Sequence, residues 1–326
     1  MSAPRRARRT IDVGVDLGGT KIQVAAMRGE KIIGTARVLT PQSGDAGDVV
    51  RAIGEMVAQA LSQADASLSS VRAVGVGSPG EIDHSTGAVI NAVNVPGFGE
   101  HFELGGELSK QLEGVRVVVD NDVSVGVLGE FRRGAGRPYK DVLGVWLGTG
   151  VGGGLILGGE LRSGRGSAGE FGHIVAKPGG RKCGCGNRGC VEAYAGRLSM
   201  ERRVLSLVAR GHKTSLLEIQ KERGRDRISS GVYARALKQG DHLATVLIDE
   251  AARAVGIGMA SAQNLVDFEA IILGGGLGDR LGEHFAHQVK HHMHHHLFAK
   301  GKPPALLGTE LGDLGGAVGA ALVTRG

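Results

Sequence analysis

The sequence is poor in aromatic residues, and it contains no long apolar segment. Phe, Trp and Tyr together make up 3% of the 326 residues, so the core has to be built from aliphatic side chains. A membrane-spanning helix needs roughly 18 or more consecutive apolar residues, and no run approaches that length. No apolar stretch follows the arginines near the N-terminus, so the first residues do not resemble a secretory signal. These absences predict a cytoplasmic protein without a membrane partner.

Two common nucleotide-binding signatures are also missing. The sequence has no GxxxxGK followed by Ser or Thr, the phosphate loop of P-loop NTPases. Residues 75–80 and 148–153 have the spacing G-x-G-x-x-G, but a turn and loop follow the first and a strand follows the second. A dinucleotide site needs a helix there, because its N-terminal N–H groups bind the pyrophosphate. The missing helices disfavour a Rossmann site.

Positive charge is concentrated at the N-terminus. Arg5, Arg6, Arg8 and Arg9 account for most of the formal net charge of +6. A short run of charge without interleaved aromatic residues is typical of a solvated tail and not of a nucleic-acid site. We therefore expect a basic tail over residues 1–10, a nearly neutral folded body and no nucleic-acid partner.

Glycine, in contrast, is abundant, with 57 residues, and it marks a repeated pattern. Residues 11–34 have the pattern strand, glycine turn, strand, tight turn, strand, and the segment from Val142 onward repeats that order. With one constant offset, Leu17, Gly18, Gly29 and Glu30 recur as Leu147, Gly148, Gly159 and Glu160. The shared offset predicts a duplicated α/β architecture. A chain of this length also exceeds what one core usually holds, so we expect two lobes with a cleft between them.

Two of the glycine turns are candidates for phosphate binding. They contain Asp16, Gly18, Gly19, Thr20 and Lys21 at the first hairpin, and Thr149 and Gly150 at the second. Consecutive Gly and Thr residues expose N–H groups and a hydroxyl, which makes an anion site from the backbone. Asp16 is suited to hold the magnesium that accompanies a phosphate, directly or through water. Ordinary hairpin turns with a capping Asp are the alternative, and the matched pair favours phosphate.

Asp122 is the candidate general base. It follows the apolar segment 115–120 and precedes a helical pattern. Carboxylates at strand ends face the ligand crevice of open α/β sheets, where a base must reach a hydroxyl. Asp120 and Asn121 are rivals, and an Asp at a helix start is often only an N-cap. The residues alone leave these alternatives open.

The strongest local signal is a group of cysteines with one histidine. All three cysteines of the chain lie between positions 183 and 190, and His173 precedes them. An odd number of cysteines in a cytoplasmic chain argues against disulfides. Three thiolates and one imidazole, Cys183, Cys185, Cys190 and His173, complete a tetrahedral zinc shell. The site is predicted to be structural, because four protein ligands leave no open position for water.

Two carboxylates, Glu170 and Glu192, bound this zinc loop, residues 170–192. Ionised carboxylates accept charge-assisted hydrogen bonds from sugar hydroxyls, so a fixed loop that presents them suits a hydroxyl-rich ligand. Ordinary surface charge is the alternative for either residue alone.

A second histidine group occupies a helical pattern near the end of the chain. Its members are His287, His291, His292, His294, His295 and His296. No cysteine or acid complements them within the run, so we interpret them as a solvated helix face that picks up metal adventitiously.

Taken together, these residues resemble the ROK family (repressor, open reading frame, kinase), and within it the bacterial glucokinases. The resemblance covers residues 13–323, and the zinc-loop pattern C-x-C-G-x-x-G-C-x-E is its most specific part. It implies a duplicated fold of the actin-like ATPase, or ribonuclease H-like, class. The implied activity is that of an ATP-dependent hexose kinase, with glucose as the expected sugar. It also implies Mg²⁺ with ATP, structural zinc and a homo-oligomer, either a dimer or a tetramer.

The resemblance further assigns roles to individual residues. The first turn, Asp16 to Lys21, and the second, Thr149 and Gly150, match phosphate contacts. A third turn matches the adenosine side, and its residues are Gly274, Gly275 and Gly276. The residues that match sugar contacts are Asn94, Asn121, Asp122, Glu170, His173 and Glu192, with Asp122 as base. The implied lobes are residues 11–122 with the C-terminal helix 313–326, and residues 123–312.

The sequence departs from the glucokinase pattern at Val123 and Ser124, where Ala-Asn is usual, which bears on sugar preference. N-acetylglucosamine or mannose kinase activity, polyphosphate as the donor, and a non-catalytic sugar sensor are the alternatives. The family's repressors carry a helix-turn-helix domain of some tens of residues, and only about ten precede the first strand, so we expect no DNA-binding domain.

Overall fold

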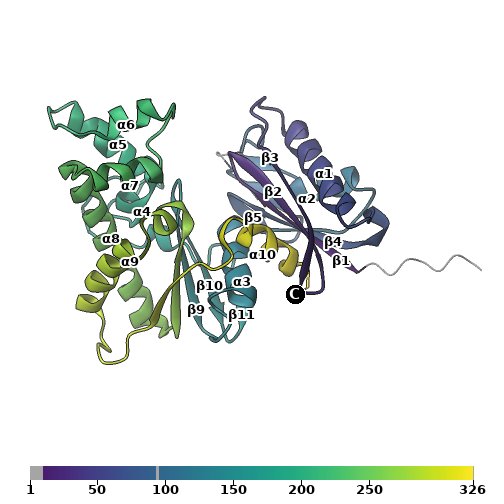
Figure 1. The fold of residues 1–326 in the computed structure, drawn as a ribbon. Helices are drawn as coiled ribbons and strands as arrows, with labels where there is room; N and C mark the ends of the chain where they lie inside the picture. Colours follow the sequence, from purple (N-terminus) through teal and green to yellow (C-terminus); the bar gives the residue numbers. More distant parts are fainter. Residues whose placement is uncertain (1–9, 93–94, 326) are drawn as a thin grey trace, which may run out of the picture. The chain divides into compact units, whose positions relative to one another are not determined.

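The computed structural model describes residues 10–92 and 95–325, so the expected basic tail lies outside the described residues except for Thr10. The chain divides into two compact units (Figure 1). The first contains Met1–Arg137, Leu161–Ala168 and Glu310–Gly326, and the second contains Pro138–Glu160 and Gly169–Thr309. No helix in the described part of the chain combines the length and the apolar composition that crossing a bilayer requires.

The first unit is built on a five-stranded sheet. Its strands, in spatial order, are β3 (Lys31–Leu39), β2 (Lys21–Arg28), β1 (Ile11–Leu17), β4 (Val71–Ser78) and β8 (Val117–Asn121). Strand β1 pairs antiparallel with β2 and parallel with β4. Its apolar side chains Ile11, Val13, Val15 and Leu17 are fully buried, as expected for a central strand covered on both faces.

Helices and a small sheet complete the first unit. They are α1 (Ala46–Ser62), α2 (Leu104–Gln111), α3 (Asp122–Arg133), α10 (Gly315–Val323), the 3₁₀ turns η1 (Leu68–Ser70) and η3 (Gly312–Leu314), and the strands β5 (Glu81–Asp83), β6 (Ala88–Ile90) and β7 (His101–Phe102).

The second unit has a five-stranded sheet of its own. In spatial order its strands are β11 (Glu160–Leu161), β10 (Val151–Leu157), β9 (Val142–Leu147), β12 (Ala270–Gly274) and β13 (Ala305–Gly308). The helices are η2 (Phe171–His173), α4 (Glu192–Ala195), α5 (Arg197–Val208), α6 (Leu216–Glu222), α7 (Ser230–Lys238), α8 (His242–Val266) and α9 (Gly275–His296). The core is aliphatic, as the shortage of aromatic residues predicted.

The two sheets share one topology, which confirms the predicted duplication. Strand β9 pairs antiparallel with β10 and parallel with β12, as β1 does with β2 and β4. Each unit therefore begins with a hairpin whose glycine turn follows a buried central strand.

The boundary of the units differs from the predicted one at residue 122. Helix α3 was assigned to the second lobe, whereas it groups with the first unit. The reason is a close packing of α3 on α10: a Cβ placed on Gly319 would come within 1.7 Å of the Val125 carbonyl oxygen. Helix α10 lies equally close to β1 and β4, at Gly14 and Gly75, where a side chain would overlap the helix backbone (Figure 1).

Candidate active site

The first glycine turn joins β1 to β2 and is held in place by two polar side chains. The amide of Gly18 donates to the carbonyl of Lys21 at 3.0 Å, which closes the turn. The hydroxyl of Thr40 donates to the Gly18 carbonyl at 2.6 Å, and the Gln42 amide donates to the Gly19 carbonyl at 3.3 Å. The sequence analysis missed both residues, because nothing in their spacing links β3 to this turn.

Asp16 lies at the end of β1 against the start of α10. A Cβ placed on Gly316 would come within 2.7 Å of the Asp16 carboxylate, so the two elements are in close contact there. Burial raises the pKa of Asp16 to about 6, while the positive charge of Lys21 lowers it and Asp313 raises it. Lys21 itself lies 3.3 Å from Asp313. A carboxylate that is short of compensating charge is suited to a divalent cation.

Asn121 and Asp122 have different roles at the start of α3. The side-chain oxygen of Asn121 accepts hydrogen bonds from the amides of Val123, at 3.0 Å, and Ser124, at 3.2 Å. Asn121 is therefore the N-cap, a role that the sequence analysis considered for Asp122. Asp122 is the first helical residue, and its Oδ1 accepts from the Val123 amide at 2.9 Å.

Asp120, the rival carboxylate, is buried in the sheet. Only 6% of it is exposed, and its Oδ1 accepts from the Asn121 amide at 2.7 Å. Burial raises the pKa of Asp120. Asp122 is half-buried, so it is the more accessible of the two carboxylates.

The second glycine turn joins β9 to β10 and is held by an arginine. The Arg197 Nε donates to the Gly148 carbonyl at 3.1 Å, and its Nη2 donates to the Thr149 hydroxyl at 3.2 Å. Burial lowers the pKa of Arg197. Arg197 was not predicted, because its only distinguishing feature in the sequence is its place directly after a glycine at the start of α5.

The third glycine turn is in fact the start of α9, which a non-helical residue, Gly282, divides into a short first part and a longer second part. Gly274 ends β12, and α9 begins at Gly275. Gly275 has a φ of 82°, and a Cβ there would come within 2.6 Å of the Leu147 amide, so this position contacts the end of β9. A Cβ on Gly276 would lie 3.7 Å from Arg197 Nη1. The second turn, Arg197 and the start of α9 therefore form one local cluster within the second unit.

The four predicted metal ligands lie together. One ligand atom from each of His173, Cys183, Cys185 and Cys190 falls within 4.8 Å of all the others. The Cys185 and Cys190 sulfurs are 3.8 Å apart, and His173 Nδ1 lies 3.8 Å from the Cys183 sulfur. Two sulfurs bound tetrahedrally at about 2.3 Å from one zinc ion would be about 3.8 Å apart. The donors and their spacing therefore fit a zinc ion.

The pKa values of the buried cysteines also agree with a bound cation. Burial raises the pKa of the Cys183 thiol to about 12 and also raises the pKa of Cys190. A cation at the centre of the four donors would supply the charge that stabilises buried thiolates. His173 Nε2 also lies 3.7 Å from Glu170 Oε2, so a carboxylate stands beside the ring nitrogen that faces away from the sulfurs.

Glu192 connects this loop to the second glycine turn. Its Oε2 accepts a hydrogen bond from the Val151 amide at 3.0 Å, and its Oε1 lies 3.8 Å from the Cys183 sulfur. A Cβ on Gly150 would come within 2.3 Å of Glu192 Oε2, so the turn needs glycine there. Of the other predicted sugar contacts, Glu170 is exposed, and Asn94 lies outside the described residues.

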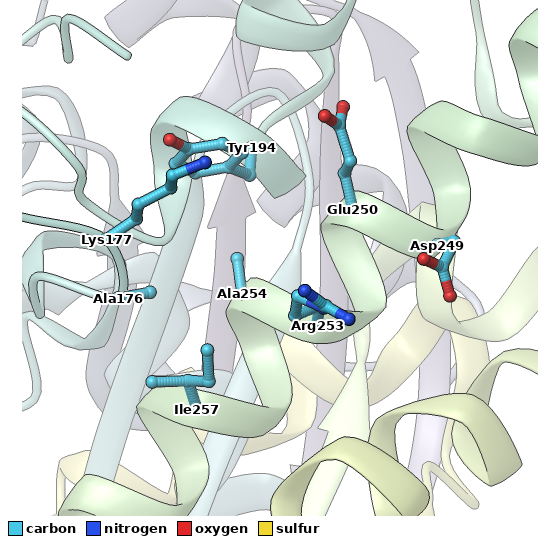
Figure 2. A pocket seen from close by; sticks show the side chains of 8 residues that line it. All are labelled: Ala176, Lys177, Tyr194, Asp249, Glu250, Arg253, Ala254 and Ile257. Carbon is cyan, nitrogen blue, oxygen red and sulfur yellow. The ribbon is translucent and has the colours of Figure 1, made fainter. Parts of the chain in front are cut away.

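A separate hollow of about 410 Å³ lies beside α8 (Figure 2). Tyr194 and Lys177 line it from the side of the zinc loop, and Glu250, Arg253 and Ile257 line it from α8. Arg181 pairs with Glu250 and lies over the Tyr194 ring. None of the predicted site residues lines this hollow, so it is distinct from the turns and the carboxylates described above.

Comparison with known proteins places these features in a family. The model of the ROK family matches residues 12–326. The chain belongs to the ROK family. This confirms the resemblance that the zinc-loop pattern indicated.

Relatives within the ROK family include several sugar kinases. The glucokinase of Streptomyces coelicolor is 33% identical over 319 residues, which cover 97% of this chain and 98% of that protein. The N-acetylmannosamine kinase of Haemophilus influenzae is 29% identical over 267 residues, which cover 82% of this chain and 80% of the kinase.

The fold agrees as well. The crystal structure of a ROK family glucokinase from Streptomyces griseus, in complex with glucose and AMPPNP, is 35% identical with a TM-score of 0.79. The match covers 97% of this chain and all of the other. The α/β, actin-like fold that the ROK resemblance implied is therefore confirmed.

Proposed function

We propose that this protein is an ATP-dependent hexose kinase that converts glucose to glucose 6-phosphate, with Asp122 as the general base. The observation that carries the proposal is the matched pair of glycine turns, one after each central strand. A carboxylate stands at the first, and a hydroxyl with a guanidinium stands at the second. Relatives that are sugar kinases over their full length support the same reaction class.

On the donor side, the backbone N–H groups of both turns are suited to phosphate oxygens. Asp16 would hold Mg²⁺, which neutralises charge on the phosphates when it is bound. The Arg197 guanidinium, fixed by Gly148 and Thr149, adds a fork of N–H donors that suits phosphate oxygens. Arg197 thus joins the predicted donor contacts as a residue that only the structure indicated.

On the acceptor side, Asp122 takes the proton of the sugar 6-hydroxyl while that oxygen attacks the γ-phosphorus. The bond between the γ-phosphorus and the bridging oxygen breaks in line, and ADP leaves with that oxygen. Asn121 supports this role, because its capping of α3 fixes the backbone on which Asp122 stands. Positioning and charge stabilisation supply most of the rate in such transfers.

The zinc loop orients the sugar and takes no part in the transfer. Cys183, Cys185, Cys190 and His173 would hold the ion, which fixes the loop when it is bound. Glu170 and Glu192 then accept hydrogen bonds from sugar hydroxyls. Glu192 already links the loop to the second turn, through the Val151 amide.

The decisive experiment replaces Asp122 by Asn and measures turnover and sugar binding separately. We expect kcat for glucose with ATP to fall by about 10²–10⁴, the usual contribution of a general base. Glucose affinity, measured by calorimetry, should change little, because an amide keeps the shape of the carboxyl. Asp120→Asn is the matched control, since it alters the neighbouring buried carboxylate, and it should retain far more turnover.

If Asp122→Asn keeps more than about a tenth of the wild-type activity, Asp122 is not the general base. The same coupled assay, run with glucose, mannose, N-acetylglucosamine and fructose, and with ATP or polyphosphate, tests the substrates. Glucose with ATP should give the highest kcat/KM. Sugar binding without turnover for any pair would instead favour a sugar sensor.

A further inference from the structure

The six histidines between His287 and His296, in the C-terminal part of α9, are not equivalent. His292 is half-buried, and its Nε2 lies 3.3 Å from Asp249 Oδ1. The other five are exposed, and two of these, His291 and His295, contact each other. The helix therefore carries one defined pair within a run that otherwise resembles a solvated face.

The pair has the geometry of a chelate. The Nε2 atoms of His291 and His295 are 3.3 Å apart, and the ring planes are nearly perpendicular, at 84°. The residues stand one helical turn apart, the i, i+4 spacing that places two imidazoles on one face of a helix for metal binding. In the structure as described the two nitrogens share a hydrogen bond, in which only one of them is protonated.

An ion fits between these nitrogens without a change of spacing. With zinc–nitrogen bonds of about 2.0–2.1 Å, a separation of 3.3 Å gives an angle of about 110° at the ion, close to tetrahedral. We propose that His291 and His295 form a second, exchangeable site for a divalent transition metal of the imidazole-preferring kind, such as Zn²⁺, Ni²⁺ or Cu²⁺.

The surroundings suit an open site. His295 lines a hollow of about 320 Å³ together with Arg253, Ile257, His292 and His296, which leaves space for water or an anion as the remaining ligands. This site has two protein ligands, whereas the cysteine cluster has four. It should therefore bind a metal ion more weakly and exchange it more readily.

The test titrates Ni²⁺ into protein that carries one equivalent of zinc per chain and follows binding by calorimetry, while zinc analysis of the filtrate reports any zinc released from the cysteine cluster. Wild type should bind one Ni²⁺ per chain without releasing zinc. His291→Ala and His295→Ala should each weaken binding about tenfold or more, because either change leaves one ligand where two acted together. The double variant should lose less than the sum of the two single losses, because either change alone already destroys the chelate.

His294→Ala and His212→Ala are the matched controls, since both residues are exposed and neither lies four residues from a member of the pair. They should bind Ni²⁺ within about twofold of wild type. Equal losses in the controls, or no loss in His291→Ala and His295→Ala, would overturn the pair as a site. Absence of Ni²⁺ binding in wild type would overturn it as well.

A second measurement guards against misfolded variants. Ni²⁺ should raise the thermal midpoint of wild type and the controls but not of the pair variants, since a ligand stabilises only the state that binds it. Sugar phosphorylation should be unchanged in all four single variants. The inference does not rest on the proposed function, because metal binding is measured without turnover.

Discussion

The two central hairpins of this protein have the same topology and different chemistry. The turn after β1 has Asp16 beside it, with Lys21 and Asp313 as its charged neighbours. The turn after β9 carries Thr149, held by the Arg197 guanidinium, with Glu192 behind it. One unit offers negative charge at its turn, and the other offers a cation and a hydroxyl.

This difference shows which features the two copies share and which features differ between them. Strand order and register recur because each buried central strand needs its neighbours on both sides. The side chains at the turns pair no strands, so they can differ between the two units. Under the proposed function, the two copies would divide a task, with Mg²⁺ held at the first turn and phosphate oxygens at the second.

At the two turns, the larger effect is expected from Asp16→Asn, which removes the carboxylate of the first turn. We expect kcat to fall by about 10²–10³ at saturating Mg²⁺, because charge on the transferring phosphate loses its stabilisation. Thr149→Val, the matched change at the second turn, should lower kcat only about tenfold. Steady-state kinetics over a Mg²⁺ series measures both. Equal losses would show that the two turns do not differ in function.

All three cysteines lie in the second unit, so removal of a metal from the zinc loop should affect one substrate selectively. Cys190→Ser, or treatment with a chelator, should raise the KM for glucose about tenfold or more, since Glu170 and Glu192 lose their fixed positions. The KM for ATP should change less. Return of zinc to the chelated wild type is the control, and it should restore the KM. A KM for glucose that stays constant in metal-free protein contradicts the proposed role.

Arg197→Met tests whether the guanidinium of the second turn acts on the donor. We expect the KM for ATP to rise about tenfold and the KM for glucose to stay within about twofold, because one charge-assisted contact to phosphate is lost. Arg197→Lys, which keeps the charge, should recover part of the affinity. Arg235→Met, at an exposed arginine of the same unit paired with Glu222, serves as the control. Parallel rises in both KM values would indicate a purely structural role.

The smallest expected effect is a dependence of stability on pH caused by Asp16. Its pKa in the folded protein is about 6, above the ordinary value of 3.8, so the folded state binds the extra proton between these values. The free energy of unfolding of metal-free protein should therefore fall, by about 1 kcal/mol between pH 5 and pH 7, from this group.

Urea denaturation of wild type and Asp16→Asn across that range isolates the contribution, because Asn cannot titrate. The difference in unfolding free energy between the two proteins should widen in favour of the variant as the pH rises. A constant difference would mean that burial of Asp16 does not raise its pKa.

Local patterns allowed much of this molecule to be predicted. The recurrence of Leu17, Gly18, Gly29 and Glu30 indicated the duplicated sheets, and the glycine turns fall where the spacing placed them. The four ligands of the cysteine cluster also lie together as predicted. That zinc binds there stays a prediction.

What the sequence did not reveal depends on contacts between distant residues. Arg197 lies far along the chain from Gly148, and only folding brings the guanidinium to that turn. Helix α3, which the prediction placed in the second lobe, groups with the first unit because its partner, α10, comes almost two hundred residues later. Asn121 and Asp122 both have side chains suited to capping, so only the helix geometry showed that Asn121 is the cap.

The close packing of α10 has a consequence for synthesis on the ribosome. The strands of the first unit emerge early, but the helix that covers β1 and β4 belongs to the segment Glu310–Gly326. At ~5–20 residues per second, the roughly 170 residues between Arg137 and Glu310 take on the order of 10–35 seconds to translate. During that interval the nascent chain exposes an uncovered sheet face, to which a chaperone can bind, and the surroundings of Asp16 are completed only after α10 has been synthesised.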